Sequence, residues 1–116
     1  PFKAAWHPLQ GCWGQYCTQI TGNYLFHSSP YNSPNKNDLS YRLYNQLGTV
    51  CSHGCVRLTV ADAKWIYDNC PLGTTVSIYN ASSLPVPKPS APWLDISSPN
   101  RGWDPTDPDP ANPWNK

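Results

Sequence analysis

The chain has 116 residues and a formal net charge of +1, with 39% hydrophobic and 13% charged residues. This length suits one domain, and the charge balance gives no electrostatic basis for binding nucleic acid or an acidic membrane. No apolar run is long enough for a membrane-spanning segment. We expect no signal peptide in this sequence. The 14 prolines argue against long helices.

A β-hairpin is predicted near the N-terminus. Residues 13–20 read as a strand, Thr21-Gly22-Asn23 as a turn, and Tyr24 to His27 as the returning strand. Residues 28–45 are polar and rich in turn-forming residues, so they predict a long loop. Loops of this length inside a compact domain often act as lids or substrate walls, and a plain surface loop is the alternative.

One helix is predicted, over Thr59 to Asn69. Thr59 can cap its N-terminus with Asp62 three residues later, and Pro71 stops it. Residues 74–79 follow as a strand rich in β-branched side chains.

The composition changes in the last third of the chain. Nine of the 14 prolines lie from Leu84 onward, which divides the chain into a body over 1–83 and an extension over 84–116 rich in Pro and Trp. Such a composition is typical of a disordered tail. The alternative is an ordered strap, which three tryptophans favour, since a solvated linker has little use for indole rings. These are Trp93, Trp103 and Trp114.

The segment before the predicted helix could carry chemistry. Cys55 follows Gly54, precedes Arg57 by two residues, and lies close to a helix N-terminus. A positive charge and nearby backbone N–H groups favour a thiolate, and such N–H groups could also hold an oxyanion. A thiolate nucleophile needs a base, and His27 at the end of the hairpin could be brought to Cys55 across the sheet.

Two other interpretations of the cysteines stay open. An arbitrary cysteine is more often a small buried side chain or half a disulfide than a nucleophile. A metal site is the second alternative, although the spacing is not that of a structural zinc site. Its ligands would be Cys51, His53 and Cys55, joined by Cys12, Cys17 or Cys70.

A family resemblance then narrows these alternatives. Residues 52–58, Ser-His-Gly-Cys-Val-Arg-Leu, resemble the signature of the L,D-transpeptidase catalytic domain of the YkuD type, with Phe26-His27-Ser28 upstream. The resemblance covers Gly11 to Asn80. It implies a mainly β fold, a YkuD-like β-sandwich or mixed sheet with one short helix after the cysteine. Because the chain starts just past a stretch that leads into the family's sheet, we expect the family's N-terminal strands to be missing.

The resemblance also implies residue roles. Cys55 would be the nucleophile and His27 its base, with Ser28 orienting the imidazole chiefly through its backbone carbonyl. Arg57 would hold the turn or a substrate carboxylate, and Tyr31 in the long loop would contribute to the substrate wall. The site and its oxyanion hole would be shaped by Ser52, His53 and Gly54.

The implied function is that of a peptidoglycan L,D-transpeptidase. The enzyme would form a thioester with a stem tetrapeptide, release D-alanine, and pass the acyl group to an amine or to water. Acyl transfer by a thiolate needs no metal, so we expect no cofactor. The resemblance implies inhibition by β-lactams of the carbapenem type, and the substrate implies a location outside the cytoplasmic membrane, in the cell wall or its periplasmic equivalent. The alternative is a non-catalytic cell-wall-binding module that retains the fold; a zinc-stabilised module is a third hypothesis.

An enzyme outside the membrane could hold disulfides. Cys12, Cys17, Cys51 and Cys70 could then form two of them and leave Cys55 as the nucleophile, and the sequence does not choose among the three pairings. Packed thiols are the alternative, and a redox link between Cys51 and Cys55 is another.

Overall fold

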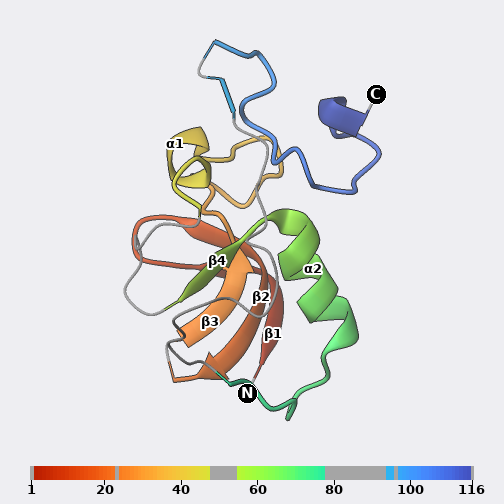
Figure 1. Cartoon of the computed structure of the whole chain (residues 1–116). Helices are drawn as coiled ribbons and strands as arrows, with labels where there is room; N and C mark the ends of the chain where they lie inside the picture. The colour runs from red at the N-terminus through yellow and green to blue at the C-terminus, as the bar shows by residue number, and fades with distance from the viewer. Residues whose placement is uncertain (1, 23, 48–54, 78–93, 96, 116) are drawn as a thin grey trace, which may run out of the picture.

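The computed structural model describes residues 2–22, 24–47, 55–77, 94–95 and 97–115. Its elements in chain order are β1 (Lys3–Pro8), β2 (Trp13–Thr21), β3 (Tyr24–Ser28), α1 (Tyr41–Tyr44), β4 (Val56–Leu58), α2 (Val60–Asn69) and a 3-10 turn, η1 (Pro113–Asn115) (Figure 1). The strands form one sheet in the order β1-β2-β3-β4. The first two pairings are antiparallel and β3 pairs with β4 in parallel, so the predicted mainly β fold with a mixed sheet and a helix after Cys55 is confirmed.

The predicted hairpin is present as β2 and β3, with Thr18 opposite Phe26. The turn uses a positive φ of 53° at Gly22, a backbone conformation that glycine adopts without steric cost. The sequence analysis did not predict β1, which pairs with β2 from Lys3 opposite Thr18 to Pro8 opposite Trp13.

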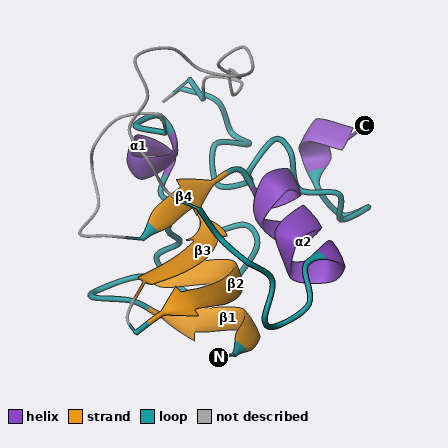
Figure 2. Ribbon diagram, turned by 60° about the horizontal axis from the view of Figure 1, so that its bottom comes forward, coloured by secondary structure: helices purple, strands orange, loops and turns teal. Residues whose placement is uncertain are grey.

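The predicted helix is α2, and its predicted cap is confirmed. Thr59 has an extended backbone, and its side-chain oxygen accepts the N–H of Asp62. Val60 and Ala63 are buried where α2 packs alongside β2 and β3 (Figure 2). The Tyr67 ring of α2 packs edge-on against Tyr16 of β2.

The strand predicted over residues 74–79 is wrong for its described part. Residues 74–77 have no regular secondary structure, and residues 78 and 79 lie outside the described residues. β-Branched composition favours an extended backbone, but a strand also needs a partner. Within the described part of the chain, Thr74 to Val76 line a groove beside Phe26 and Ile66 instead of pairing with the sheet.

The long loop after β3 is folded into the core. Tyr31 exchanges two backbone hydrogen bonds with Trp13, and the loop closes with the single turn of α1. Tyr31, Leu39 and Tyr44 are each at most 3% exposed and form one cluster with Val60 and Leu94. Because these side chains supply the core, the loop is held in place by the burial of its own apolar groups.

The described part of the C-terminal extension packs against this body and is ordered. Leu94 belongs to the core cluster, and the backbone carbonyl of Gly102 accepts the N–H of Leu39. This segment lies at the end of the molecule that also holds α1 and the start of α2 (Figure 1). For residues 94–95 and 97–115 the ordered strap is therefore the correct alternative.

Gly102→Ala tests how closely the extension packs. A methyl group there would lie 2.3 Å from the carbonyl oxygen of Asn37, which is backbone and cannot move alone. We expect the free energy of unfolding to fall by about 3 kcal/mol in urea titrations, as for an overpacked site. Gly11→Ala is the comparison, since a methyl at Gly11 meets nothing within 4 Å and carries only the strain of its positive φ, about 1 kcal/mol. Equal losses for the two variants would contradict this packing.

Candidate active site

Three of the predicted site residues meet in one pocket of about 770 Å³. His27 is on β3, Arg57 is on β4, and Cys55 lies directly before β4. The pocket opens on the face of the sheet opposite α2, because Phe26, the neighbour of His27 on β3, lies beside Ile66 of α2. The remaining lining residues are Phe2, His7, Pro8, Leu9, Gln10, Cys12, Gly22 and Leu25.

The parallel pairing of β3 with β4 brings these residues together. Phe26 is opposite Val56 and His27 is opposite Arg57. Side chains two residues apart on a strand share a face, so Cys55 lies on the same side as Arg57 and His27. Residues far apart in the sequence thus become neighbours through a single strand pairing.

The imidazole of His27 is buried, 2% exposed, and oriented by its neighbour Ser28. Nδ1 of His27 lies 2.5 Å from the backbone carbonyl oxygen of Ser28. A carbonyl only accepts hydrogen bonds, so Nδ1 must carry the proton, and the neutral ring keeps its lone pair on Nε2. This is the tautomer that a general base acting through Nε2 requires.

Ser28 is itself fixed by hydrogen bonds. Its hydroxyl accepts the backbone N–H of Gln15 from β2 at 2.9 Å and donates to the carbonyl of Ser29 at 2.9 Å. The side chain is fully buried. The hydroxyl therefore ties β3 to β2 at the point where the Ser28 carbonyl contacts the histidine.

Burial lowers the pKa of His27 below its ordinary value of 6.5, and the nearby charges of Arg57 and His7 lower it further. The hydrogen bond to Ser28 acts in the opposite direction but does not outweigh burial. At neutral pH the imidazole is therefore uncharged and able to accept a proton.

Gly14 on β2 makes room for this ring. A methyl group at Gly14 would lie 3.0 Å from Sγ of Cys17 and 3.1 Å from Cβ of His27. These distances are shorter than ordinary van der Waals contacts, so a larger side chain would displace either the thiol or the imidazole.

Two further thiols lie near Cys55. Cys17 is fully buried, and burial together with the neighbouring Cys55 raises its pKa to about 12, so it stays protonated. Cys12 lines the pocket, and burial raises its pKa while the charge of Arg57 partly offsets that effect. No disulfide joins two of the described cysteines, and Cys12, Cys17 and Cys70 are thiols. Cys51 lies outside the described residues, but any two disulfides among these four cysteines would include one pair drawn from Cys12, Cys17 and Cys70, so the structure does not contain the predicted two disulfides.

The predicted site residues that remain are Ser52, His53, Gly54 and Tyr31. Ser52, His53 and Gly54 lie outside the described residues. Tyr31 is fully buried in the core, with its ring edge-on to Trp6, and does not line the pocket. Its buried position therefore gives no support to the predicted contact of Tyr31 with substrate.

The pocket also contains residues that the sequence analysis did not assign to a site. His7 enters it from β1, and Cys12 from the turn between β1 and β2. No sequence signal separated His7 from an ordinary polar residue, because β1 itself was not predicted. In the described ranges, no group of three or more His, Cys, Asp or Glu side chains is arranged to hold a metal ion.

Comparison with known proteins identifies the family of this chain. The family model of the L,D-transpeptidase catalytic domain, YkuD, matches residues 3–78, which is more than half of the chain. The chain belongs to this family. It is also similar to a Bacillus subtilis (strain 168) protein named "Putative L,D-transpeptidase YciB", with 47% identity over 57 residues. Those residues are 49% of this chain and 28% of that protein, so the chain matches less than a third of this relative. No solved structure gives a significant match.

The lowered pKa of His27 predicts a pH dependence of stability. Just below pH 6.5 the unfolded chain binds a proton that the folded chain does not, so the free energy of unfolding falls as pH drops through 6.5. Asp104 and Asp107, whose pKa values burial raises, act in the opposite direction at lower pH. Urea midpoints from pH 7.5 to 5.5 should fall more steeply for the wild type than for His27→Asn. Parallel slopes would show that His27 is not held neutral by burial.

Proposed function

We propose that this chain is a cysteine-dependent L,D-transpeptidase that acts on peptidoglycan stem peptides. The observation that carries the proposal is the meeting of Cys55, an oriented neutral His27 and Arg57 in one pocket of an L,D-transpeptidase catalytic domain. Family membership supports the class of reaction, and in this proposal Cys55 is the nucleophile and His27 is the base.

In the first half-reaction, Nε2 of His27 takes the proton of the Cys55 thiol. The thiolate attacks the carbonyl carbon of the third residue of a stem tetrapeptide, and backbone N–H groups near Cys55 stabilise the oxyanion. When this intermediate collapses, the bond to D-alanine breaks and His27 returns its proton to the leaving amine. The product is a thioester on Cys55.

In the second half-reaction, an amine of another stem peptide attacks the thioester. His27 takes a proton from this amine, the new amide forms, and the thiolate of Cys55 leaves and is reprotonated by His27. The product is a cross-link between the third residues of two stem peptides. Water in place of the amine gives a carboxypeptidase reaction.

The electrostatics of the pocket support these roles. A buried imidazole with a lowered pKa is uncharged at neutral pH and can accept a proton in both half-reactions. The guanidinium of Arg57 lines the same pocket and has the fork geometry that binds a carboxylate in two places. We assign Arg57 to the terminal carboxylate of the donor peptide.

The substrate implies a location. Peptidoglycan stem peptides are cross-linked outside the cytoplasmic membrane, and we propose that the chain works there. Within the described ranges, no helix has the length and apolar character that crossing a membrane requires.

A carbapenem provides the test, because its strained ring would acylate a competent Cys55 and remain bound. We expect intact mass spectrometry to show one adduct on the wild type and none on Cys55→Ala. Cys70→Ala is the matched control, since Cys70 ends α2 and lies outside the pocket, and it should form the adduct like the wild type.

A folded wild type with Cys55 reduced that forms no adduct would contradict the proposal. That result would favour the non-catalytic cell-wall-binding module.

A further inference from the structure

The described part of the C-terminal extension, residues 94–95 and 97–115, lies beyond the family match and is here called the C-terminal clamp. It contacts the body at the start of α2 and along the loop between β3 and α1. The loop follows β3, which carries His27, and α2 follows β4, which Cys55 directly precedes.

The clamp supplies hydrogen-bond acceptors to the first turn of α2. The N–H of Val60 donates to Oδ2 of Asp104 at 3.0 Å, and the N–H of Ala61 donates to Oγ1 of Thr106 at 3.0 Å. The next N–H, of Asp62, is accepted by the helix's own cap, Thr59. A helix leaves its first N–H groups without intrahelical partners, and two of those in α2 depend on the clamp.

The carboxylate of Asp104 is held in place by its own segment. Its Oδ1 accepts the backbone N–H of Thr106 at 2.7 Å and the hydroxyl of Thr106 at 2.6 Å. The side-chain amide of Asn112 donates to the carbonyls of Asp104 and Asp107, at 3.0 and 2.9 Å. Asp104 and Asn112 are fully buried, so these bonds compensate for lost hydration and fix one geometry.

The start of α2 is joined to the pocket by a short path. Val60 follows the end of β4 by two residues, and the carbonyl of Leu58 at that end accepts the N–H of Ser29 at 2.9 Å. Ser29 follows Ser28, whose carbonyl contacts His27. Asp104 thus binds the chain two residues after Leu58, whose hydrogen bond with Ser29 lies at the end of the β3–β4 pairing.

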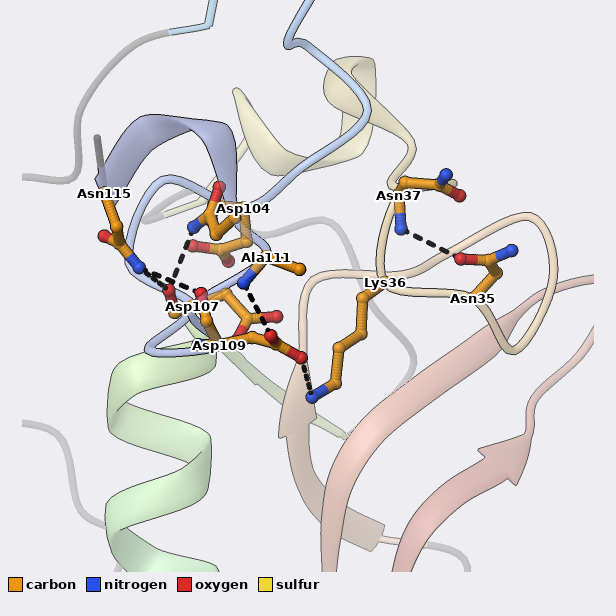
Figure 3. Close-up of polar contacts among 9 residues, drawn as sticks. Asn35, Lys36, Asn37, Asp104, Asp107, Asp109, Ala111 and Asn115 are labelled. Carbon is orange, nitrogen blue, oxygen red and sulfur yellow. Dashed lines mark hydrogen bonds and ion pairs between the residues drawn. The ribbon is translucent and has the colours of Figure 1, made fainter.

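The clamp also holds the loop after β3. Asn45 and Leu94 exchange two hydrogen bonds, and Leu39 donates to the carbonyl of Gly102. Figure 3 shows Lys36 reaching from the loop to Asp109 of the clamp, with its Nζ 2.7 Å from the carboxylate.

We propose that the C-terminal clamp is a positioning element of the candidate active site, and that Asp104 is its positioning residue. By binding the first N–H of α2, Asp104 holds the β4–α2 corner and keeps Cys55 in register with His27. This inference rests on the proposed function for its catalytic meaning, and the geometric part can be measured without turnover.

Asp104→Ala is the test and Asp107→Ala its matched control. Both aspartates are fully buried, but the Asp107 carboxylate accepts only the N–H of Asp109 within the clamp. In carbapenem time courses below the unfolding temperature, we expect Asp104→Ala to lower the limiting acylation rate about tenfold with an unchanged half-saturating concentration. Asp107→Ala should stay within about twofold of the wild type, and Asp104→Asn, which keeps one acceptor oxygen, should recover part of the loss.

Amide hydrogen exchange separates the two proposals. In Asp104→Ala the Val60 and Ser29 amides should exchange about tenfold faster than in Asp107→Ala, whether or not the wild type is acylated. If the wild type shows no acylation but this exchange pattern appears, the proposed function fails and the positioning contact stands. Thr106→Val, which removes the acceptor for Ala61, replaces Asp104→Ala if that variant does not fold.

One outcome would overturn the positioning role. If Asp104→Ala only lowers the unfolding midpoint, and its limiting acylation rate and amide exchange at Ser29 equal those of Asp107→Ala, the clamp is structural and does not position the site.

Discussion

The parallel pairing of β3 with β4 is the constraint on which the rest of this structure depends. The pairing sets His27 opposite Arg57 and places Cys55 on the same face of the sheet. A shift by one residue would turn Cys55 to the face that α2 covers, because side chains alternate along a strand. The hydrogen bonds of Ser28 and the space left by Gly14 fix the position of the His27 ring. They can serve Cys55 only in this register, because only then does Cys55 lie on the same face as the ring.

A three-residue strand such as β4 needs support from outside the sheet. Support comes from α2, which starts two residues after β4 and buries Val60 in the core. The start of α2 in turn bonds to Asp104 and Thr106 of the C-terminal clamp. A single helix cap is worth about 1 kcal/mol, a noticeable share of the stability of a small domain. The same contacts therefore contribute to folding and hold the corner where β4 meets α2.

Much of this arrangement could be predicted from the sequence, for identifiable reasons. The hairpin and α2 carry local signals, a Gly turn and a Thr cap, and both are confirmed.

The segment from Lys3 to Pro8 has no strong strand pattern and becomes β1 only by pairing with β2. Residues 74–77 have strand-like composition but no partner within the described chain. The clamp contacts are long-range bonds between polar groups, and no local pattern indicates them. The sequence predicts Tyr31 in a substrate wall, but its side chain is buried in the core cluster.

The proposed mechanism requires that a stem peptide acylates Cys55 with His27 as the base. The most direct measurement is incubation of the chain with a stem tetrapeptide, with D-alanine release and intact mass followed together. We expect D-alanine release and a thioester confined to Cys55, both abolished in Cys55→Ala and strongly reduced in His27→Asn. D-Alanine release that persists in Cys55→Ala, or a folded wild type that neither releases D-alanine nor gains mass, would contradict it.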